Sequence, residues 1–183
     1  MKVKIDTLTQ QSHIVQMAQG ELIAPHFTLK ELANNAGSKE LPQYILSPDS
    51  DRFNACLESF RVWYDYPIVV SSGYRQEAYN KRIKGADPKS CHLIACAIDF
   101  NRNRICRWRD DEIAVSWQFE LLKAAYGPII GEINFYDGYL HIGAFSDKQY
   151  GYKKYTIRDY RRSLFSNDLR RLTLENGWNY ERY

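Results

Sequence analysis

Hydrophobic residues recur along residues 53–64 at the three- and four-residue spacing of an α-helix. The residues that would share one face of this helix are Phe53, Cys56, Leu57, Phe60, Trp63 and Tyr64. Ser50 or Asp51 stands where an N-cap would form, and Pro67 would end the helix. We therefore expect an amphipathic helix whose apolar side packs into a core, with Cys56 as a small core residue.

A second helix start lies upstream of this helix. The segment from Thr28 to Glu31 has the spacing of a capping box, in which the Thr28 hydroxyl caps the amide of Glu31 and the glutamate reaches back. Phe27 and Leu32 occupy the positions of a hydrophobic staple. Residues 38–49 contain two prolines, and this composition indicates a loop.

Several other segments have the pattern of a regular element. Short apolar runs predict strands at residues 68–71 and 93–100. Helical spacing predicts a helix over 76–83, a longer helix from 110 to 127 and an amphipathic stretch over 163–175. This mixed order of elements predicts an α+β fold, in which helices flank a small and mainly antiparallel sheet.

Asp137-Gly138 separates two strand-like runs within residues 129–145. An Asp-Gly pair in this position predicts a β-hairpin with a two-residue type I′ turn. Such a hairpin places Asn134 opposite His141 on the neighbouring strand. Glu132 then shares the face of His141, at a diagonal separation of roughly 7–8 Å that is too long for direct contact.

The 183 residues, of which 44% are hydrophobic, suit one domain with a real core. The net charge of +3 is unevenly distributed, because residues 146–183 carry nine lysines and arginines against five acidic residues. A basic segment of this kind suits a solvated tail, or contact with an acidic polymer or a partner subunit. We divide the chain into an N-terminal arm (1–25), a main domain (26–145) and a basic, tyrosine-rich C-terminal extension (146–183).

The four cysteines form no Cys-x-x-Cys pair, and a disulfide framework is not expected. A structural zinc site made of Cys91, Cys96 and Cys106 with His92 is an alternative, although its spacing fits no common zinc ribbon. Residues 1–20 contain no apolar run long enough for a signal peptide or a membrane span. We therefore expect a protein that is made in the cytoplasm and needs another factor for its release.

His92 and Asp99 lie seven residues apart, and His141 follows about forty residues later. Two imidazoles and one carboxylate can hold a zinc ion and leave one coordination position open for water, which points to metal-assisted hydrolysis. Because seven is an odd spacing, His92 and Asp99 would face opposite sides of a regular strand. They can share a metal if His92 precedes the strand or if a bulge intervenes.

Hydrolysis at such a metal also needs a carboxylate that moves a proton and a cation that binds substrate oxygens. Glu132 and Asp137 are the two candidates for the general base, and Asp137 has the simpler alternative role of a turn residue. Arg75 is the candidate cation, because its guanidinium offers a planar fork to carboxylate or oxyanion oxygens. The alternative for Arg75 is a surface salt bridge.

Several motifs occur together in one order. The chain resembles the zinc peptidases of the D-alanyl-D-alanine carboxypeptidase (VanY-like) family, which includes phage endolysins that cut L-alanyl-D-glutamate bonds. The resemblance covers roughly residues 26–145. It rests on Phe27–Leu32, Ser72-Gly73-Tyr74-Arg75, Asn80, Lys84-Gly85-Ala86, Ser90-x-His92 with Ala97-x-Asp99, and Tyr139-Leu140-His141-Ile142.

The resemblance implies a fold like that of the DD-peptidases and the hedgehog domain. It also implies a zinc ion bound by His92, Asp99 and His141. Arg75, Ser90 and Tyr139 are then expected to contact the substrate. Two positions depart from the family pattern: Ala95 stands where the family usually has glycine, and Gly138 stands where it has its catalytic Glu or Asp, three residues before the last histidine.

From these features we expect a zinc-dependent peptidoglycan peptidase, either a carboxypeptidase or an endopeptidase on stem peptides with D-amino acids. We expect it to act in phage lysis or within a virion, on the cell wall after release, with no membrane span. Residues 146–183 could contact a phage structural partner, and nucleic acid is the less favoured partner. The alternative is a catalytically silent module of the same fold that binds zinc or cell wall.

Overall fold

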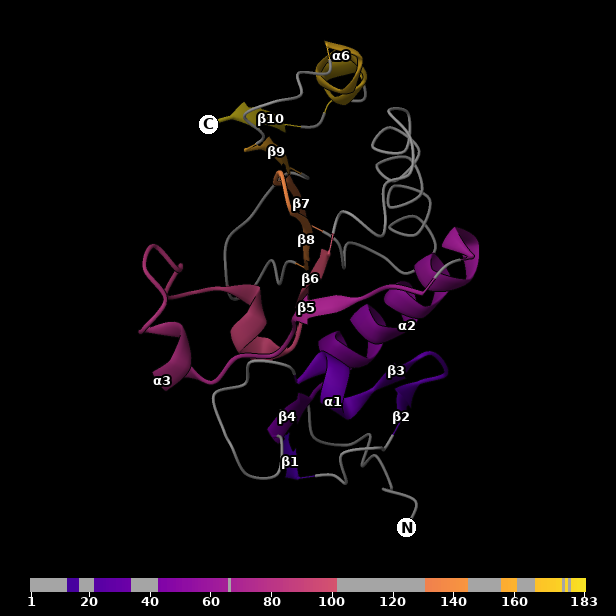
Figure 1. Ribbon diagram of the computed structural model, residues 1–183, viewed down its shortest axis with the longest axis vertical. Coiled ribbons are helices and arrows are strands. Elements are labelled where there is room, and N and C mark those ends of the chain that lie inside the picture. Colours follow the sequence, from indigo (N-terminus) through magenta and orange to yellow (C-terminus); the bar gives the residue numbers. More distant parts are fainter. Residues whose placement is uncertain are drawn as a thin grey trace.

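A six-stranded mixed sheet runs through the centre of the structure (Figure 1). The computed structural model describes residues 13–16, 22–33, 43–65, 67–101, 131–144, 156–160, 167–175, 177 and 179–183. The strands of the sheet, in spatial order, are β10 (Asn179–Arg182), β9 (Thr156–Asp159), β7 (Glu132–Phe135), β8 (Tyr139–Gly143), β6 (Ala97–Asn101) and β5 (Val70–Ser72). Helices and a largely antiparallel sheet confirm the expected α+β class.

The hairpin of β7 and β8 forms with the expected register. Asn134 lies opposite His141, and the amide of Tyr136 donates to the carbonyl of Tyr139 at 3.0 Å. The expected type I′ turn is wrong, because neither Asp137 nor Gly138 has the left-handed backbone that this turn requires. The strand pairing and the stacked rings of Tyr136 and Tyr139 fix the register without that turn.

One face of the sheet is apolar and forms the core. Its fully buried side chains are Ile98, Phe100, Ile133, Phe135, Leu140, Ile142 and Ile157. Helix α2 (Pro48–Tyr64) packs on this face, with Phe60 stacked on Phe100 at 6.3 Å between ring centroids. Cys56 is fully buried as expected, whereas Trp63 is 42% exposed and lies outside the apolar stripe. Each large apolar side chain buried in this layer contributes about 1.5–3 kcal/mol.

The opposite face of the sheet is polar, and its residues stand in register from strand to strand. Asp99 of β6 pairs with His141 of β8, which pairs with Asn134 of β7. Asn134 pairs in turn with Arg158 of β9, and Arg158 pairs with Glu181 of β10. Because directly paired residues share a face, these five side chains form one polar row across five strands.

Helix α2 begins three or four residues earlier than the sequence pattern suggested. Its N-cap is Ser47, whose hydroxyl accepts from the amide of Ser50, while the Ser50 hydroxyl accepts from the amide of Ser47. Pro48 occupies the first helical position, where a missing N–H costs nothing. The expected cap at Ser50 or Asp51 is therefore wrong, because the proline belongs to the helix and not to the loop before it.

The N-terminal part contains strands that were not expected. In the predicted loop, β4 (Gln43–Leu46) pairs with β1 (His13–Gln16), since the prolines at 42 and 48 flank this strand without interrupting it. Within the predicted arm, β2 (Leu22–Ala24) pairs with β3 (Phe27–Thr28). Helix α1 (Leu29–Leu32) follows β3 and has the expected capping box.

Residues 146–183 contribute structure to the main sheet. Strands β9 and β10 run parallel to β7 and extend the sheet beyond the hairpin. Helix α6 (Asn167–Glu175) lies within the amphipathic stretch expected at 163–175. The helix expected over 110–127 lies outside the described residues. None of the helices in the described part of the chain is long and apolar enough to cross a bilayer.

The segment around His92 is not a strand. Residues Cys91–Ile94 form a short 3-10 helix, η1, which follows helix α3 (Glu77–Asn80) and a series of turns. Ala95 then adopts a left-handed backbone with φ 57°, which explains why glycine suits this position, and β6 starts only at Ala97. His92 therefore precedes the strand, which is the first of the two arrangements that would let it meet Asp99.

Gly73 allows α1 to lie against the end of β5. A Cβ atom at Gly73 would lie 1.9 Å from the carbonyl oxygen of Leu32, a distance that real atoms do not reach. That same oxygen accepts a hydrogen bond from the amide of Tyr74 at 2.6 Å.

Gly73→Ala should therefore lower the free energy of unfolding by about 3 kcal/mol, because the backbone of α1 must move to accommodate the methyl group. Urea denaturation of the zinc-free protein measures this change. Gly138→Ala is the matched control, since a Cβ there meets nothing within 4 Å. Equal stability of the two variants would show that α1 does not pack as described.

Candidate metal centre

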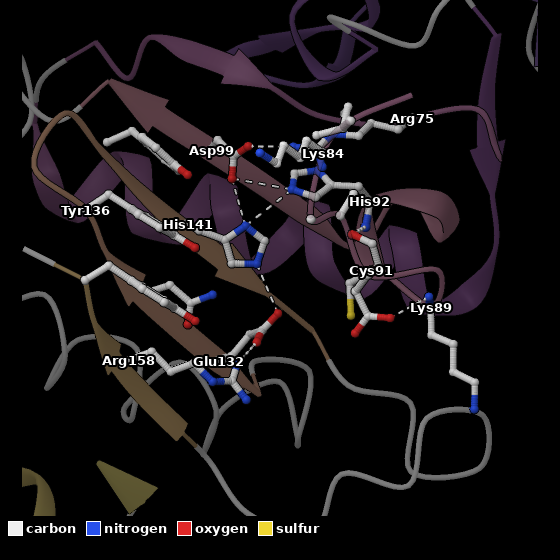
Figure 2. A pocket seen from close by; sticks show the side chains of 18 of the residues that line it. Arg75, Lys84, Lys89, Cys91, His92, Asp99, Glu132, Tyr136, His141 and Arg158 are labelled. Carbon is white, nitrogen blue, oxygen red and sulfur yellow. Dashed lines mark hydrogen bonds and ion pairs between the residues drawn. The ribbon is translucent and has the colours of Figure 1, made fainter. Parts of the chain in front are cut away.

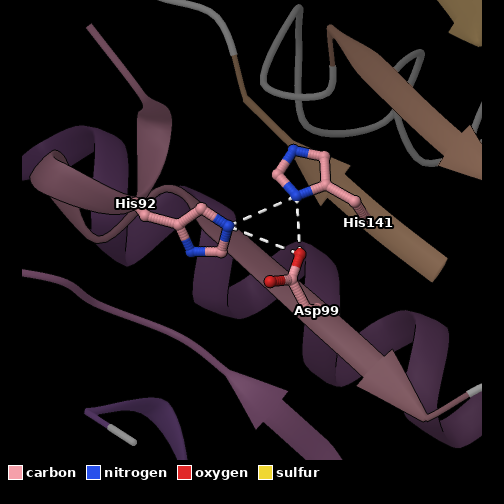
Figure 3. Close-up of side chains that lie close together, drawn as sticks. All are labelled: His92, Asp99 and His141. Carbon is pink, nitrogen blue, oxygen red and sulfur yellow. Dashed lines mark hydrogen bonds and ion pairs between the residues drawn. The ribbon is translucent and has the colours of Figure 1, made fainter. Parts of the chain in front are cut away.

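Three side chains from distant parts of the chain point toward a common centre (Figure 3). His92 comes from η1, Asp99 from β6 and His141 from β8. His92 Nε2 lies 3.4 Å from Asp99 Oδ1 and 3.3 Å from His141 Nδ1, and His141 Nδ1 lies 2.7 Å from Asp99 Oδ1. All three residues are buried.

These distances fit the ligand shell of a tetrahedral metal ion. Zinc binds imidazole nitrogen and carboxylate oxygen at about 2.0–2.2 Å, so neighbouring ligand atoms stand roughly 3.3–3.5 Å apart. Two of the three separations already have this value. The third is a direct hydrogen bond between His141 and Asp99, which a bound cation would replace by a slight outward shift of the two groups.

Each of the three side chains is held from behind by a second contact. His92 Nδ1 donates to the carbonyl oxygen of Gly73 at 2.7 Å, so Nε2 faces the centre. His141 Nε2 donates to Glu132 Oε1 at 3.0 Å, so Nδ1 faces the centre. Asp99 Oδ2 accepts from Arg75 Nη2 at 2.8 Å. Outer partners of this kind fix the orientation of metal ligands in proteins.

The contact between Glu132 and His141 corrects the expectation that their diagonal placement is too long for contact. Glu132 pairs directly with Gly143, which has no side chain. A Cβ at Gly143 would lie 2.8 Å from Glu132 Oε1 and 3.1 Å from His141 Nε2. The glycine thus leaves the space in which the long glutamate side chain reaches across to the imidazole.

Glu132 has a second partner on β9. Its Oε2 accepts from Arg158 Nη1 (Figure 2). Arg158 Nε in turn donates to Glu181 Oε2 at 2.7 Å. Arg158 is about one-fifth exposed, so this ion pair is shielded from solvent. The contacts therefore run without a break from Glu181 on β10, through Arg158 and Glu132, to His141.

The electrostatics of the site keep its carboxyl groups ionised. Burial raises the pKa values of Asp99 and Glu132, but hydrogen bonds and charges outweigh burial. His141 and His92 hold the pKa of Asp99 well below its usual range, and His141 with Arg158 lowers the pKa of Glu132 to about 2. Both groups therefore act as hydrogen-bond acceptors at neutral pH.

The two histidines differ in charge. Burial lowers the pKa of His92, which is therefore neutral at pH 7 and suited to bind a metal through Nε2. Burial alone would also lower the pKa of His141, but its hydrogen bonds to Asp99 and Glu132 raise the pKa to about 9. A metal ion at Nδ1 would take the place of the proton on this nitrogen.

Other expected site residues occupy distinct positions around the centre. Arg75 forms a largely buried ion pair with Asp99, which differs from the surface salt bridge considered as its alternative. Ser90 caps η1 by accepting from the amide of His92, and both Ser90 and Tyr139 line the pocket. Asp137 lies exposed at the hairpin turn and does not line the pocket.

The alternative zinc site with cysteines receives no support from the described residues. Cys91 and Cys96 are buried and donate to the backbone carbonyls of Ala144 and Ile94. In the described part of the chain, the group of potential metal ligands that comes together is His92, Asp99 and His141, without a cysteine. Cys106 lies outside the described residues.

A polar pocket of about 510 Å³ opens over this centre (Figure 2). Several of its lining residues were not expected from the sequence: Lys84, Lys89, Asn134, Tyr136, Arg158, Tyr160 and Tyr183. Three of these come from β9, β10 and the residues that follow them. The alternation of side chains over residues 156–160 and 179–183 was the sequence signal for these strands. Each run is too short and too polar to be distinguished from a loop by its sequence.

The chain matches one known protein family. Residues 25–125 match the family model described as Peptidase M15, which covers more than half of the chain. The chain belongs to the M15 peptidase family. This family comprises zinc D-Ala-D-Ala carboxypeptidases and VanY-like peptidases, as the sequence motifs indicated. No curated protein and no solved structure matches the chain.

Membership in the M15 family implies a metallopeptidase, and the donor set described above fits the zinc ion of that family. The matched region includes Arg75, His92 and Asp99 but ends before His141. The third donor and its partner Glu132 are therefore placed by the geometry of the β7–β8 hairpin and not by the family match.

The stability of the zinc-free M15 peptidase should depend on pH in both directions. The pKa of Glu132 is lowered from 4.5 to about 2, so its contribution is complete above pH 4.5 and is lost as the pH falls toward 2. The pKa of His141 is raised from 6.5 to about 9, so its contribution is complete below pH 6.5 and is lost as the pH rises through 9. Thermal denaturation in a chelator should give the highest Tm between about pH 4.5 and 6.5, and His141→Gln should remove most of the alkaline decline.

Gly143→Ala should weaken zinc binding without unfolding the protein. The new methyl group would displace the end of the flexible Glu132 side chain, and His141 would lose the partner that orients it. We expect a 10- to 100-fold loss of zinc affinity in a competition assay with a chromogenic chelator. Gly138→Ala on the same hairpin is the control, and an unchanged affinity of Gly143→Ala would contradict the role of Glu132 as the partner of His141.

Proposed function

We propose that this M15 peptidase is a zinc-dependent peptidase that cleaves peptide bonds in the stem peptides of peptidoglycan. The observation that carries the proposal is the complete orientation of three donor atoms by outer partners, at the floor of a polar pocket. Membership in the M15 family supports both the metal and the class of substrate.

His92 Nε2, Asp99 Oδ1 and His141 Nδ1 would hold the zinc ion. When bound, zinc supplies a Lewis acid that polarises the scissile carbonyl group and makes water more acidic. Arg75 holds Asp99 in place through Oδ2 and stands at the wall of the pocket. Lys84 and Lys89 add two exposed cations, which would attract the carboxylates of a stem peptide.

Glu132 and Asp137 are the proposed carboxylates for proton transfer, and their positions differ. Glu132 lines the pocket, but its two ion partners and its pKa of about 2 favour a role in orienting His141. A general base works best when its pKa lies near the working pH. Asp137 lies at the exposed turn, and the hairpin would have to bend for it to reach the centre.

This arrangement supports a second candidate function. Gly138 occupies the place of the family's catalytic acid, and Glu132 is engaged with His141 and Arg158. A module that binds zinc and cell wall but does not turn over substrate has the same site. The two candidates share the metal and differ only in hydrolysis.

We further propose a carboxypeptidase or endopeptidase that acts on D-amino-acid-containing stem peptides in phage lysis or as part of a virion. In this proposal the protein is made in the cytoplasm and meets the cell wall after release. Residues 146–183, beyond the strands that they give to the sheet, could contact a phage structural partner.

The test is the release of new amino groups from purified peptidoglycan by the zinc-loaded protein. We expect release that a chelator abolishes and added zinc restores. His141→Ala should lose zinc and thermal stability together, because the metal binds only the folded state. With both variants loaded with zinc, Asp137→Asn and Glu132→Gln should differ in rate by at least tenfold, and the slower variant identifies the residue that moves the proton.

Bound zinc without any release of amino groups would support the silent module. Unchanged zinc content in His141→Ala would contradict the assignment of this residue as a ligand. The Tyr79→Phe variant is the control for substitution as such, since Tyr79 lies on α3 and does not line the pocket.

A further inference from the structure

Four tyrosine rings stack in a row along one wall of the pocket. Tyr139 stacks on Tyr136 at 4.2 Å between ring centroids, Tyr136 on Tyr160 at 4.6 Å, and Tyr160 on Tyr183 at 4.6 Å. The planes of neighbouring rings differ by 13° at most. We call Tyr139, Tyr136, Tyr160 and Tyr183 the tyrosine ladder.

The register of the sheet explains this ladder. Tyr139 opens β8, while Tyr136, Tyr160 and Tyr183 directly follow β7, β9 and β10. The strand registers place all four at the same level of four adjacent strands. Neighbouring strands lie about 4.7–4.9 Å apart, which is close to the stacking distance of aromatic rings. The ladder is thus a rigid product of strand pairing.

Stacking covers the faces of the rings, so a ligand would meet their edges, where the Tyr183 hydroxyl donates to Glu181 Oε2 at 3.0 Å. All four tyrosines line the pocket, and Figure 2 shows Tyr136 with its hydroxyl directed toward the side of His141. Burial raises the pKa values of Tyr136 and Tyr160, so their hydroxyl groups stay neutral at physiological pH. A neutral hydroxyl can both donate and accept a hydrogen bond, as the amide groups of a peptide also do.

The ladder begins beside the metal centre and leads away from it. Tyr139 lies two residues from His141 on β8, on the same face of the strand. From Tyr139 to Tyr183 the wall crosses three ring-to-ring steps of 4.2–4.6 Å. An extended peptide rises about 3.3 Å per residue, so this wall has the length of roughly four residues.

We propose that the tyrosine ladder is a substrate-binding wall that takes an extended peptide of about four residues, which leads away from the metal centre. This inference rests on the proposed peptidase function and specifies its substrate: a stem peptide bound over several residues, and not a free dipeptide. All four tyrosines lie outside the matched residues 25–125, so the wall is built by the part of the chain beyond the family match.

The test removes hydroxyl groups and keeps the rings. The double variant Tyr160→Phe/Tyr183→Phe preserves stacking but loses two hydrogen-bonding groups at the far end of the ladder. With the zinc-loaded protein and a soluble stem pentapeptide, we expect KM to rise about tenfold while kcat changes little. For a dipeptide with the same scissile bond, the rise in KM should be much smaller. Tyr79→Phe should leave both substrates unaffected.

Direct binding separates this inference from the proposed function. The zinc-free protein should bind the same pentapeptide in calorimetry, with about tenfold weaker affinity in the double variant. If the wild type hydrolyses nothing but this difference in binding persists, the peptidase fails and the binding wall stands. If hydrolysis occurs and KM is unchanged in the double variant, the binding wall is overturned alone. Binding of peptide-free glycan strands in place of the pentapeptide would also overturn it.

Discussion

The register of the central sheet is the constraint on which the site depends. Strand pairing sets Asp99, His141, Asn134, Arg158 and Glu181 in one row on the polar face, and it sets four tyrosines in the next row. A slip of one residue at any strand would turn its polar side chains to the core face and its apolar side chains to the opposite face. The apolar residues of the other face oppose such a slip, because they would then be exposed. The packing of the apolar face against α2 therefore fixes the positions of the polar side chains on the opposite face of the sheet.

Within this frame, charge balance keeps the buried polar groups in place. An ionised carboxylate is costly to bury unless it is paired and hydrogen-bonded. Asp99 is paired with Arg75, and Glu132 is paired with Arg158, so each of these two carboxylates has its own guanidinium. Arg75 contacts Asp99 through Oδ2, which leaves Asp99 Oδ1 and the two imidazoles to face the centre. The site thus combines a fixed ligand geometry with room for one dication.

The sequence was sufficient for features that depend on local spacing. The capping box at Thr28 and the pairing of Asn134 with His141 are of this kind. Features that depend on tertiary contact were missed. Strands β1, β4, β9 and β10 each have four residues of mixed polarity, so they form because they pair with neighbouring strands and not because of their own sequence pattern. The contact between Glu132 and His141 depends on the empty space at Gly143, which strand spacing alone does not reveal.

The strand order β10-β9-β7-β8-β6-β5 also bears on how the protein is made. Asp99 and His92 leave the ribosome before His141, and Arg158 follows later still. Contacts between such distant segments give the sheet a high contact order, and folds of this type form slowly because long loops must close first. The complete ion-binding geometry therefore arises at a late stage of folding, after translation has passed residue 158. Nascent chains would carry an incomplete cluster, so zinc capture would report the finished fold and not an early intermediate.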